Sequence, residues 1–201
     1  GAEQSGVIED IGFETYHRIL DEAVAELRHD EFGELFDEKQ APRVGETSVE
    51  VDLDAFIPEV YLPNRVERLN IYRRIAEASD EEALAGILAE LQDRFGPTSD
   101  PIQGLFDSAL LKLIGERIRL PRVVFKNQRL FLSIPGDKDD PYFFDRIFQQ
   151  LLADLNTIDN RVALKEGKTG KLRAIIQDVA DMNTAIALLR SLAKGVGVPP
   201  A

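Results

Sequence analysis

Residues 123–134 read VVFKNQRLFLSI, which is two short apolar runs joined by a polar turn. The runs Val123–Phe125 and Leu130–Ile134 flank Asn127-Gln128, an arrangement typical of a β-hairpin. Asp140-Pro141 is a common helix start, and apolar residues at helical spacing follow it over residues 144–152. This stretch therefore predicts a strand–strand–helix unit.

The same order of elements occurs a second time downstream. Val162–Leu164 and Leu172–Ile176 flank a glycine-bounded turn at Gly167–Gly170, and a helix is expected from Asp181 through Leu192. Two consecutive strand–strand–helix units predict a four-stranded antiparallel sheet with both helices on one face. The predicted fold class is α+β.

Upstream of this sheet the chain is expected to be mostly helical. Residues 49–53 alternate between apolar and acidic side chains, which predicts one short half-buried strand. Residues 64–118 predict three helices joined by tight turns, with capping signals at Asn64 and Ser79. An earlier amphipathic helix is indicated by apolar residues at three- and four-residue steps, namely Phe13, Tyr16, Leu20, Val24 and Leu27.

These elements suggest how the chain is organised. Residues 1–12 are small and polar at their start and are expected to be a linker, residues 13–118 a mostly helical acidic part, and residues 119–201 the α+β part. The two larger parts are expected to form one compact domain over residues 13–201. Because the only methionine is Met182, we expect the chain to be a piece of a longer protein or a processed chain.

Composition excludes several functional classes. The 201 residues include 24 Lys and Arg against 36 Asp and Glu, a net charge of −12, and no cysteine, which rules out disulfide frameworks and thiolate metal sites. No apolar run approaches the roughly 20 residues of a membrane span. The acidic charge is concentrated in the first hundred residues and opposes binding to phosphate backbones. It suits a basic protein surface, or it simply keeps the chain soluble.

Catalytic patterns are missing from the sequence. There is no phosphate-binding loop of the form GxxxxGK[ST]. His17 and His29 are twelve residues apart on one expected helix, about 18 Å along its axis, so they cannot share a metal ion. The carboxylates of Asp137, Asp139 and Asp140 could in principle bind Mg²⁺, but a turn and helix capping already account for them. We expect no catalytic residue, metal ligand or cofactor site in this chain.

Two charged groups of residues are candidate binding sites. Glu90 and Asp93 lie three residues apart near the end of a predicted helix, with Arg94 beside them, outside its apolar stripe. Carboxylates there are disfavoured by the helix dipole, which suggests either an arginine from a partner or plain solvation. The second group gathers around the second hairpin turn and is a weaker nucleic-acid candidate or a solvated turn: Lys165, Lys168, Lys171 and Arg173.

Five ordered segments resemble one protein family. Residues 90–97, ELQDRFGP, resemble the E-L-x-D-R-F-G-x signature of the C-terminal domain of bacterial transcription-repair coupling factors, the Mfd proteins. Residues 56–63, FIPEVYLP, and 68–76, RLNIYRRIA, resemble that family's F-I-P-x-x-Y segment and following helix. Residues 12–16, GFETY, resemble the family's G-F-x-x-Y entry. Residues 1–6, GAEQSG, resemble the end of the run that closes the motor in this family, which implies that residues 1–12 are the tail of that motor.

The resemblance implies a role for the chain within a longer parent. Such parents are cytoplasmic ATP-driven DNA translocases, with ATP and magnesium held in a motor upstream of this chain, that displace stalled RNA polymerase and recruit UvrA. The C-terminal domain is non-catalytic and folds back on an N-terminal UvrB-like module, masking its UvrA-binding surface. The implied docking residues are Glu90, Asp93 and Arg94, and no direct DNA or membrane binding is expected. The alternative is a DNA- or polymerase-binding accessory module that uses the basic hairpin.

Overall fold

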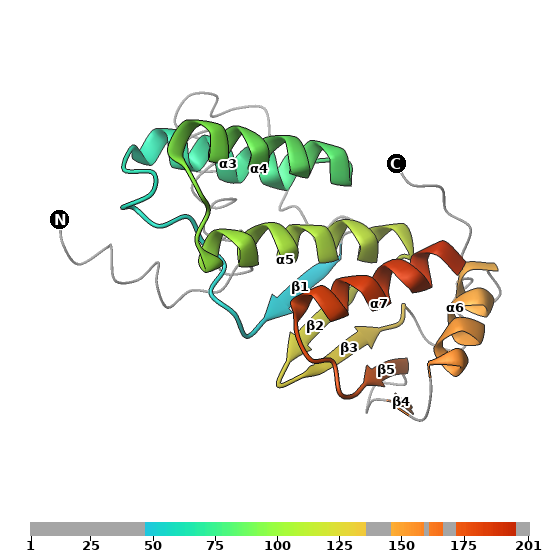
Figure 1. Ribbon diagram of the computed structural model, residues 1–201. Helices are drawn as coiled ribbons and strands as arrows, with labels where there is room; N and C mark the ends of the chain where they lie inside the picture. Colours follow the sequence, from blue (N-terminus) through green and yellow to red (C-terminus); the bar gives the residue numbers. More distant parts are fainter. Residues whose placement is uncertain (1–46, 136–145, 159–160, 167–171, 196–201) are drawn as a thin grey trace, which may run out of the picture.

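The computed structural model describes residues 47–135, 146–158, 161–166 and 172–195 (Figure 1). The expected helix over 13–27, His17, His29, the three carboxylates at 137, 139 and 140, Lys168 and Lys171 lie outside these residues. The elements, in chain order, are β1 Ser48–Val51, α3 Arg65–Glu77, α4 Glu81–Phe95, α5 Asp100–Arg117, β2 Arg122–Lys126, β3 Arg129–Ser133, α6 Arg146–Thr157, β4 Val162–Glu166, β5 Leu172–Ile176 and α7 Met182–Gly195.

Five strands form one mixed sheet in the order β1-β2-β3-β5-β4. Both predicted hairpins are present as antiparallel pairs, and β3 also pairs antiparallel with β5. The β2–β3 turn has positive φ at both Asn127 (51°) and Gln128 (55°), the backbone that a two-residue hairpin requires. The α+β fold class is confirmed.

The four predicted strands pair antiparallel as expected, but the sheet has one strand more than predicted. Strand β1 adds a fifth strand that runs parallel to β2, with Val49 opposite Val123. Parallel neighbours need a long crossover connection, and here α3, α4 and α5 supply it. Alternation in the sequence indicated the strand, but a partner more than 70 residues away leaves no local signal.

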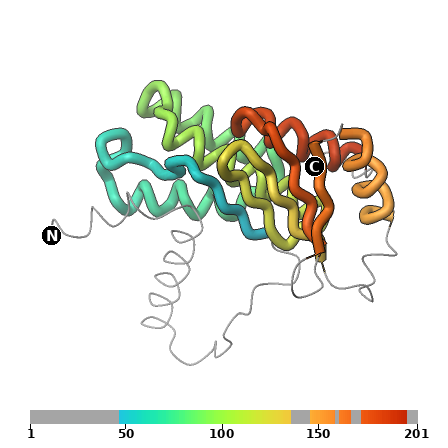
Figure 2. Tube along the Cα trace, turned by 90° about the horizontal axis from the view of Figure 1, so that it is seen from below, coloured from blue at the N-terminus to red at the C-terminus, as the bar shows by residue number. Residues whose placement is uncertain are grey.

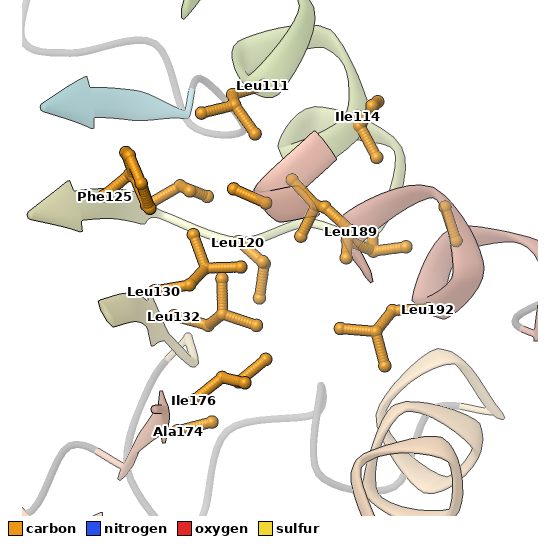
Figure 3. Close-up of a cluster of buried hydrophobic side chains, with 14 of the residues drawn as sticks. Leu111, Ile114, Leu120, Phe125, Leu130, Leu132, Ala174, Ile176, Leu189 and Leu192 are labelled. Carbon is orange, nitrogen blue, oxygen red and sulfur yellow. The ribbon is translucent and has the colours of Figure 1, made fainter. Parts of the chain in front are cut away.

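Three helices pack on one face of the sheet. Alternate strand residues point toward them: Val123 and Phe125 on β2, Leu130 and Leu132 on β3, and Ala174 and Ile176 on β5 are all buried. Figure 3 shows Phe125, Leu130, Leu132, Ala174 and Ile176 in this core. Leu111 and Ile114 of α5, Leu151 of α6, and Leu189 and Leu192 of α7 complete this core. No described helix packs on the opposite face of the sheet, and Figure 2 shows the strands lying side by side next to the helical layer.

A second core lies between α3, α4 and α5. Leu84, Ile87 and Leu91 of α4 pack with residues of α3, α5 and the extended segment before α3. As predicted, Asn64 caps α3, because its side chain accepts a hydrogen bond from the Glu67 amide at 3.1 Å. The cap of α4 is one residue later than predicted: Asp80, not Ser79, accepts from the Ala83 amide at 2.7 Å.

Helix α5 belongs to both cores and holds them together. Its residue Leu110 packs against each of them. Close approaches are made at glycines: a Cβ at Gly115 would lie 2.7 Å from the Thr47 methyl group, and the Thr47 hydroxyl donates to the Leu120 carbonyl at 2.6 Å. Glu81 at the start of α4 pairs with Arg117 of α5 and Arg190 of α7 at 3.2 and 2.6 Å. The α3–α4 pair is therefore fixed to the sheet through α5.

Candidate docking surface

The signature helix α4 ends in a structured corner. The hydroxyl of Tyr61 lies 3.1 Å from the Leu91 carbonyl oxygen and 2.9 Å from the Gly96 carbonyl oxygen. It therefore donates a hydrogen bond to carbonyl groups at the C-terminal end of α4. The Tyr61 ring packs on Phe95 with centroids 5.9 Å apart. Gly96 has φ 88°, a backbone conformation that favours glycine and terminates the helix. The motif therefore builds a rigid end from which its charged residues project.

Glu90 and Arg94 belong to a four-residue ion-pair network between α3 and α4. Arg74 of α3 donates to Glu90 at 2.6 Å, and Arg94 donates to Glu90 at 3.3 Å within α4. Arg94 also pairs with Glu67 in the first turn of α3. Since the start of α3 pairs with the end of α4, the two helices run in opposite directions, and the network joins them along one side.

The network lowers the pKa of Glu90. The hydrogen bond from Arg74 is the main cause, and Arg94 adds to it. The side chain of Glu90 is 37% exposed and that of Arg74 is 41% exposed, so each ion pair stabilises the fold only modestly. The guanidinium of Arg94 also lies 4.8 Å from the centre of the Phe95 ring, which restricts its position further. The result is an ordered, ionised and accessible carboxylate.

Asp93 differs from its neighbour. It is exposed on the last turn of α4, and no ion pair or hydrogen bond joins its side chain to another described residue. The helix dipole therefore acts on it without compensation from the described part of the chain. Glu90 therefore has arginine partners within the described chain, whereas Asp93 has none there. Of the two carboxylates that the sequence singled out, Asp93 is the one that a partner's cation could still pair with.

Sequence reasoning missed two members of this network. Arg74 and Glu67 lie on a different helix from the motif, and only the packing of α3 on α4 brings them to it. Arg74 lies within the segment 68–76 that resembles the family's helix. The resemblance therefore pointed to this helix, but the sequence did not show that Arg74 pairs with Glu90. The docking role of Glu90, Asp93 and Arg94 stays a prediction.

The basic hairpin is only partly described. Lys165 of β4 and Arg173 of β5 are directly opposite each other in the sheet, and both are exposed. Lys168 and Lys171 lie outside the described residues. Like charges directly across a strand pair repel, so this arrangement favours an anionic group nearby.

Two further properties concern only the described part of the chain. No group of three or more His, Asp or Glu side chains there is placed to hold a metal ion. Of the helices described, none is long and apolar enough to cross a membrane.

Comparison with known proteins places this arrangement in a family. A family model described as the TRCF domain matches residues 51–143, which begin at the last residue of β1 and include the α3–α4 network and the hairpin β2–β3. Residues 51–143 of this chain belong to the TRCF domain family. The TRCF match therefore contains both the signature helix and the helix that supplies Arg74 and Glu67.

Relatives of this TRCF domain are longer proteins. The chain is 33% identical over 138 residues to the transcription-repair-coupling factor of Myxococcus xanthus, covering 68% of this chain and 11% of that protein. It is 35% identical over 123 residues to that of Escherichia coli strain K12, covering 61% of this chain and 10% of that protein. The chain thus spans about a tenth of the length of these relatives.

A solved structure shares the fold of this TRCF domain. The crystal structure of the C-terminal domain of a transcription-repair coupling factor superposes with a TM-score of 0.61 at 20% sequence identity. The match covers 78% of this chain and 95% of that one.

Proposed function

We propose that this TRCF domain is a non-catalytic docking domain of a transcription-repair coupling factor. In the longer protein it folds back on an N-terminal UvrB-like module and restrains recruitment of UvrA. The parent is an ATP-dependent DNA translocase that displaces stalled RNA polymerase at lesions. ATP and magnesium bind in the parent's motor, and this chain holds neither.

The exposed charged end of α4 carries the proposal. Arg74 and Arg94 hold Glu90 ionised and in place, while Asp93 has no partner among the described residues. A partner arginine can contact Asp93 directly and approach Glu90 on its exposed side, with the planar guanidinium geometry that suits paired carboxylates. Such a surface binds a basic protein face and opposes binding to the phosphate backbone of DNA.

The test uses the full-length parent and a double substitution. Glu90→Ala with Asp93→Ala removes the two carboxylates, and we expect the affinity for UvrA to rise at least tenfold because the restraint is lost. Tenfold corresponds to about 1.4 kcal/mol, which is within the cost of truncating charges that an interface buries. The fold should survive, since exposed ion pairs contribute about 1 kcal/mol or less each.

A matched control comes from the other end of the same helix pair. Glu77→Ala with Glu82→Ala also removes two exposed carboxylates from α3 and α4, and should leave UvrA affinity unchanged. The melting temperature of the 201-residue chain is measured for both variants. If the first pair leaves UvrA affinity unchanged while the chain stays folded, docking does not depend on these residues and the proposal is wrong.

A further inference from the structure

The face of the sheet opposite the helices has an ordered pattern of side chains. The register places three rows across the strands on this open face. The central row begins with Glu50 at the β1 edge and continues with four half-buried apolar residues, Val124, Phe131, Ile175 and Ala163. The first outer row contains Arg122, Ser133, Arg173 and Lys165, and the second contains Lys126 and Arg129, with Arg161 beside them at the start of β4.

Positive charge dominates both outer rows. Six cations stand at these positions against two acids at the β1 edge, Glu50 and Asp52. Glu50 pairs with Arg122, and Asp52 accepts a hydrogen bond from the Asn127 amide at 2.7 Å. The other five cations make no ion pair with any residue that the structure describes. An excess of cations around an apolar strip that no described helix covers is unusual in a chain whose net charge is −12.

The cations are also placed against each other. Lys126 is directly opposite Arg129 at one end of the hairpin, and Arg173 is directly opposite Lys165 at the other side of the sheet. Like charges directly opposite each other on a strand pair destabilise a sheet. The two pairs lie on opposite sides of one apolar row. A ligand that carries negative charge along both of its sides would reduce the repulsion in both pairs at once.

We propose that the open face of the sheet is a docking site for an acidic amphipathic helix of a partner protein. Residues of the two outer rows are four positions apart on a strand, about 13 Å. A helix with its side chains is about 10–12 Å across, so one lying on the central row places acidic side chains over both outer rows. The four apolar strand positions span about 14 Å, the length of about ten helical residues.

Nucleic acid fits the same surface less well. Phosphates would satisfy the cations but leave the apolar row facing a charged backbone. Single strands bind sheets by stacking bases on several aromatic side chains, and the central row offers only Phe131. Charge complementarity and the apolar strip are used together only by an acidic amphipathic partner.

The binding experiment uses the whole 201-residue chain and a labelled 18-residue model peptide. The peptide has leucines along one helical face and glutamates on both flanks, and its matched control is a scrambled peptide of equal composition. Fluorescence anisotropy at 50 mM salt should show at least tenfold tighter binding of the amphipathic peptide. Binding should weaken as salt rises to 500 mM, because the flanking contacts are ionic.

Variants of the chain locate the site. Lys126→Glu with Arg173→Glu should weaken peptide binding at least tenfold, and Phe131→Ser should do the same while changing the salt dependence little. The control, Arg65→Glu with Arg73→Glu, makes the same charge change on exposed residues of α3 and should leave binding unaltered. Circular dichroism shows whether each variant is folded. If Phe131→Ser unfolds the chain, the charge variants still test the site, because they leave this half-buried phenylalanine unchanged.

Four results would overturn the proposal. Equal binding of the scrambled peptide would show that charge alone acts. Tighter binding of a 20-base-pair duplex or a 20-nucleotide single strand would make the face a nucleic-acid site. Binding seen only when Asp21, Glu22 and Glu26 are changed to amides would make the chain's own N-terminal segment the occupant. Self-association that the sheet variants abolish would make it a second copy.

Discussion

Two helical glycines provide a matched test of how closely α5 packs. A Cβ built at Gly104 would lie 2.3 Å from the backbone carbonyl oxygen of Asp54. A carbon and a carbonyl oxygen approach to about 3.3 Å at the closest, so Gly104→Ala must separate the two backbones by on the order of 1 Å. The neighbouring hydrogen bond from the Phe56 amide to the Pro101 carbonyl, 3.1 Å long, would be stretched by the same movement.

The magnitude follows from two opposing terms. Overpacking costs about 1–3 kcal/mol, and we expect the upper end because neither contacting group belongs to a flexible side chain. Alanine improves the free energy of a helix interior by about 1 kcal/mol relative to glycine. Gly104→Ala should therefore lower the free energy of unfolding by about 2 kcal/mol. Gly86→Ala in α4, where nothing lies within 4 Å of the new Cβ, should raise it by about 0.5–1 kcal/mol.

Urea denaturation followed by circular dichroism measures both variants. With an m value of about 2 kcal/mol per molar, the midpoint should fall by about 1 M for Gly104→Ala and rise by up to about 0.5 M for Gly86→Ala. Amide exchange at Phe56 should accelerate only in the first variant. If Gly104→Ala is as stable as Gly86→Ala, α5 can move away from residue 54 without cost and the reasoning is refuted.

Three further predictions concern contacts that hold the domain together. Thr47→Val deletes the hydroxyl that donates to the buried Leu120 carbonyl at 2.6 Å and should cost about 1–3 kcal/mol in urea denaturation; an unchanged midpoint would contradict this. The pKa of Asp80 is lowered from 3.8 chiefly by the Ala83 amide, so its stabilising effect is present above that pH and lost as pH falls through the folded pKa. Asp80→Asn should therefore flatten the fall of melting temperature in acid, and a slope equal to that of the unaltered chain would exclude this capping role. Glu81→Gln breaks the pairs with Arg117 and Arg190 and should lower stability by about 1 kcal/mol or less, with a difference that disappears in high salt.

Local patterns in the sequence were sufficient for most elements. The alternating apolar residues of 123–134 and 162–176 predicted two hairpins, and both are present. The Asn64 cap was also found as expected, because capping depends on residues only a few positions apart. The cap of α4 moved by one residue because Ser79 and Asp80 are both good caps and the sequence did not distinguish them.

Longer-range relationships required the folded chain. The motif 90–97 identified a charged helix end, but its partners Arg74 and Glu67 became visible only when α3 packed on α4. The same packing gives Glu90 a cationic partner, Arg74, but gives Asp93 none among the described residues. The open face is a similar case, since no run of sequence shows that Lys126, Phe131 and Arg173 share one surface.

The sequence by itself determined the α+β class, the hairpins, the helix ends to within a residue at α3 and α4, and the charged motif, because side-chain period, turn residues and caps act over a few residues. Only the tertiary structure decided that β1 joins the sheet parallel to β2, which residues pair across helices, and which face of the sheet the described helices leave uncovered. The physical reason is that register and helix packing are set by which apolar surfaces bury each other. That choice is made among segments far apart in the chain, and it leaves no periodic trace in any one of them.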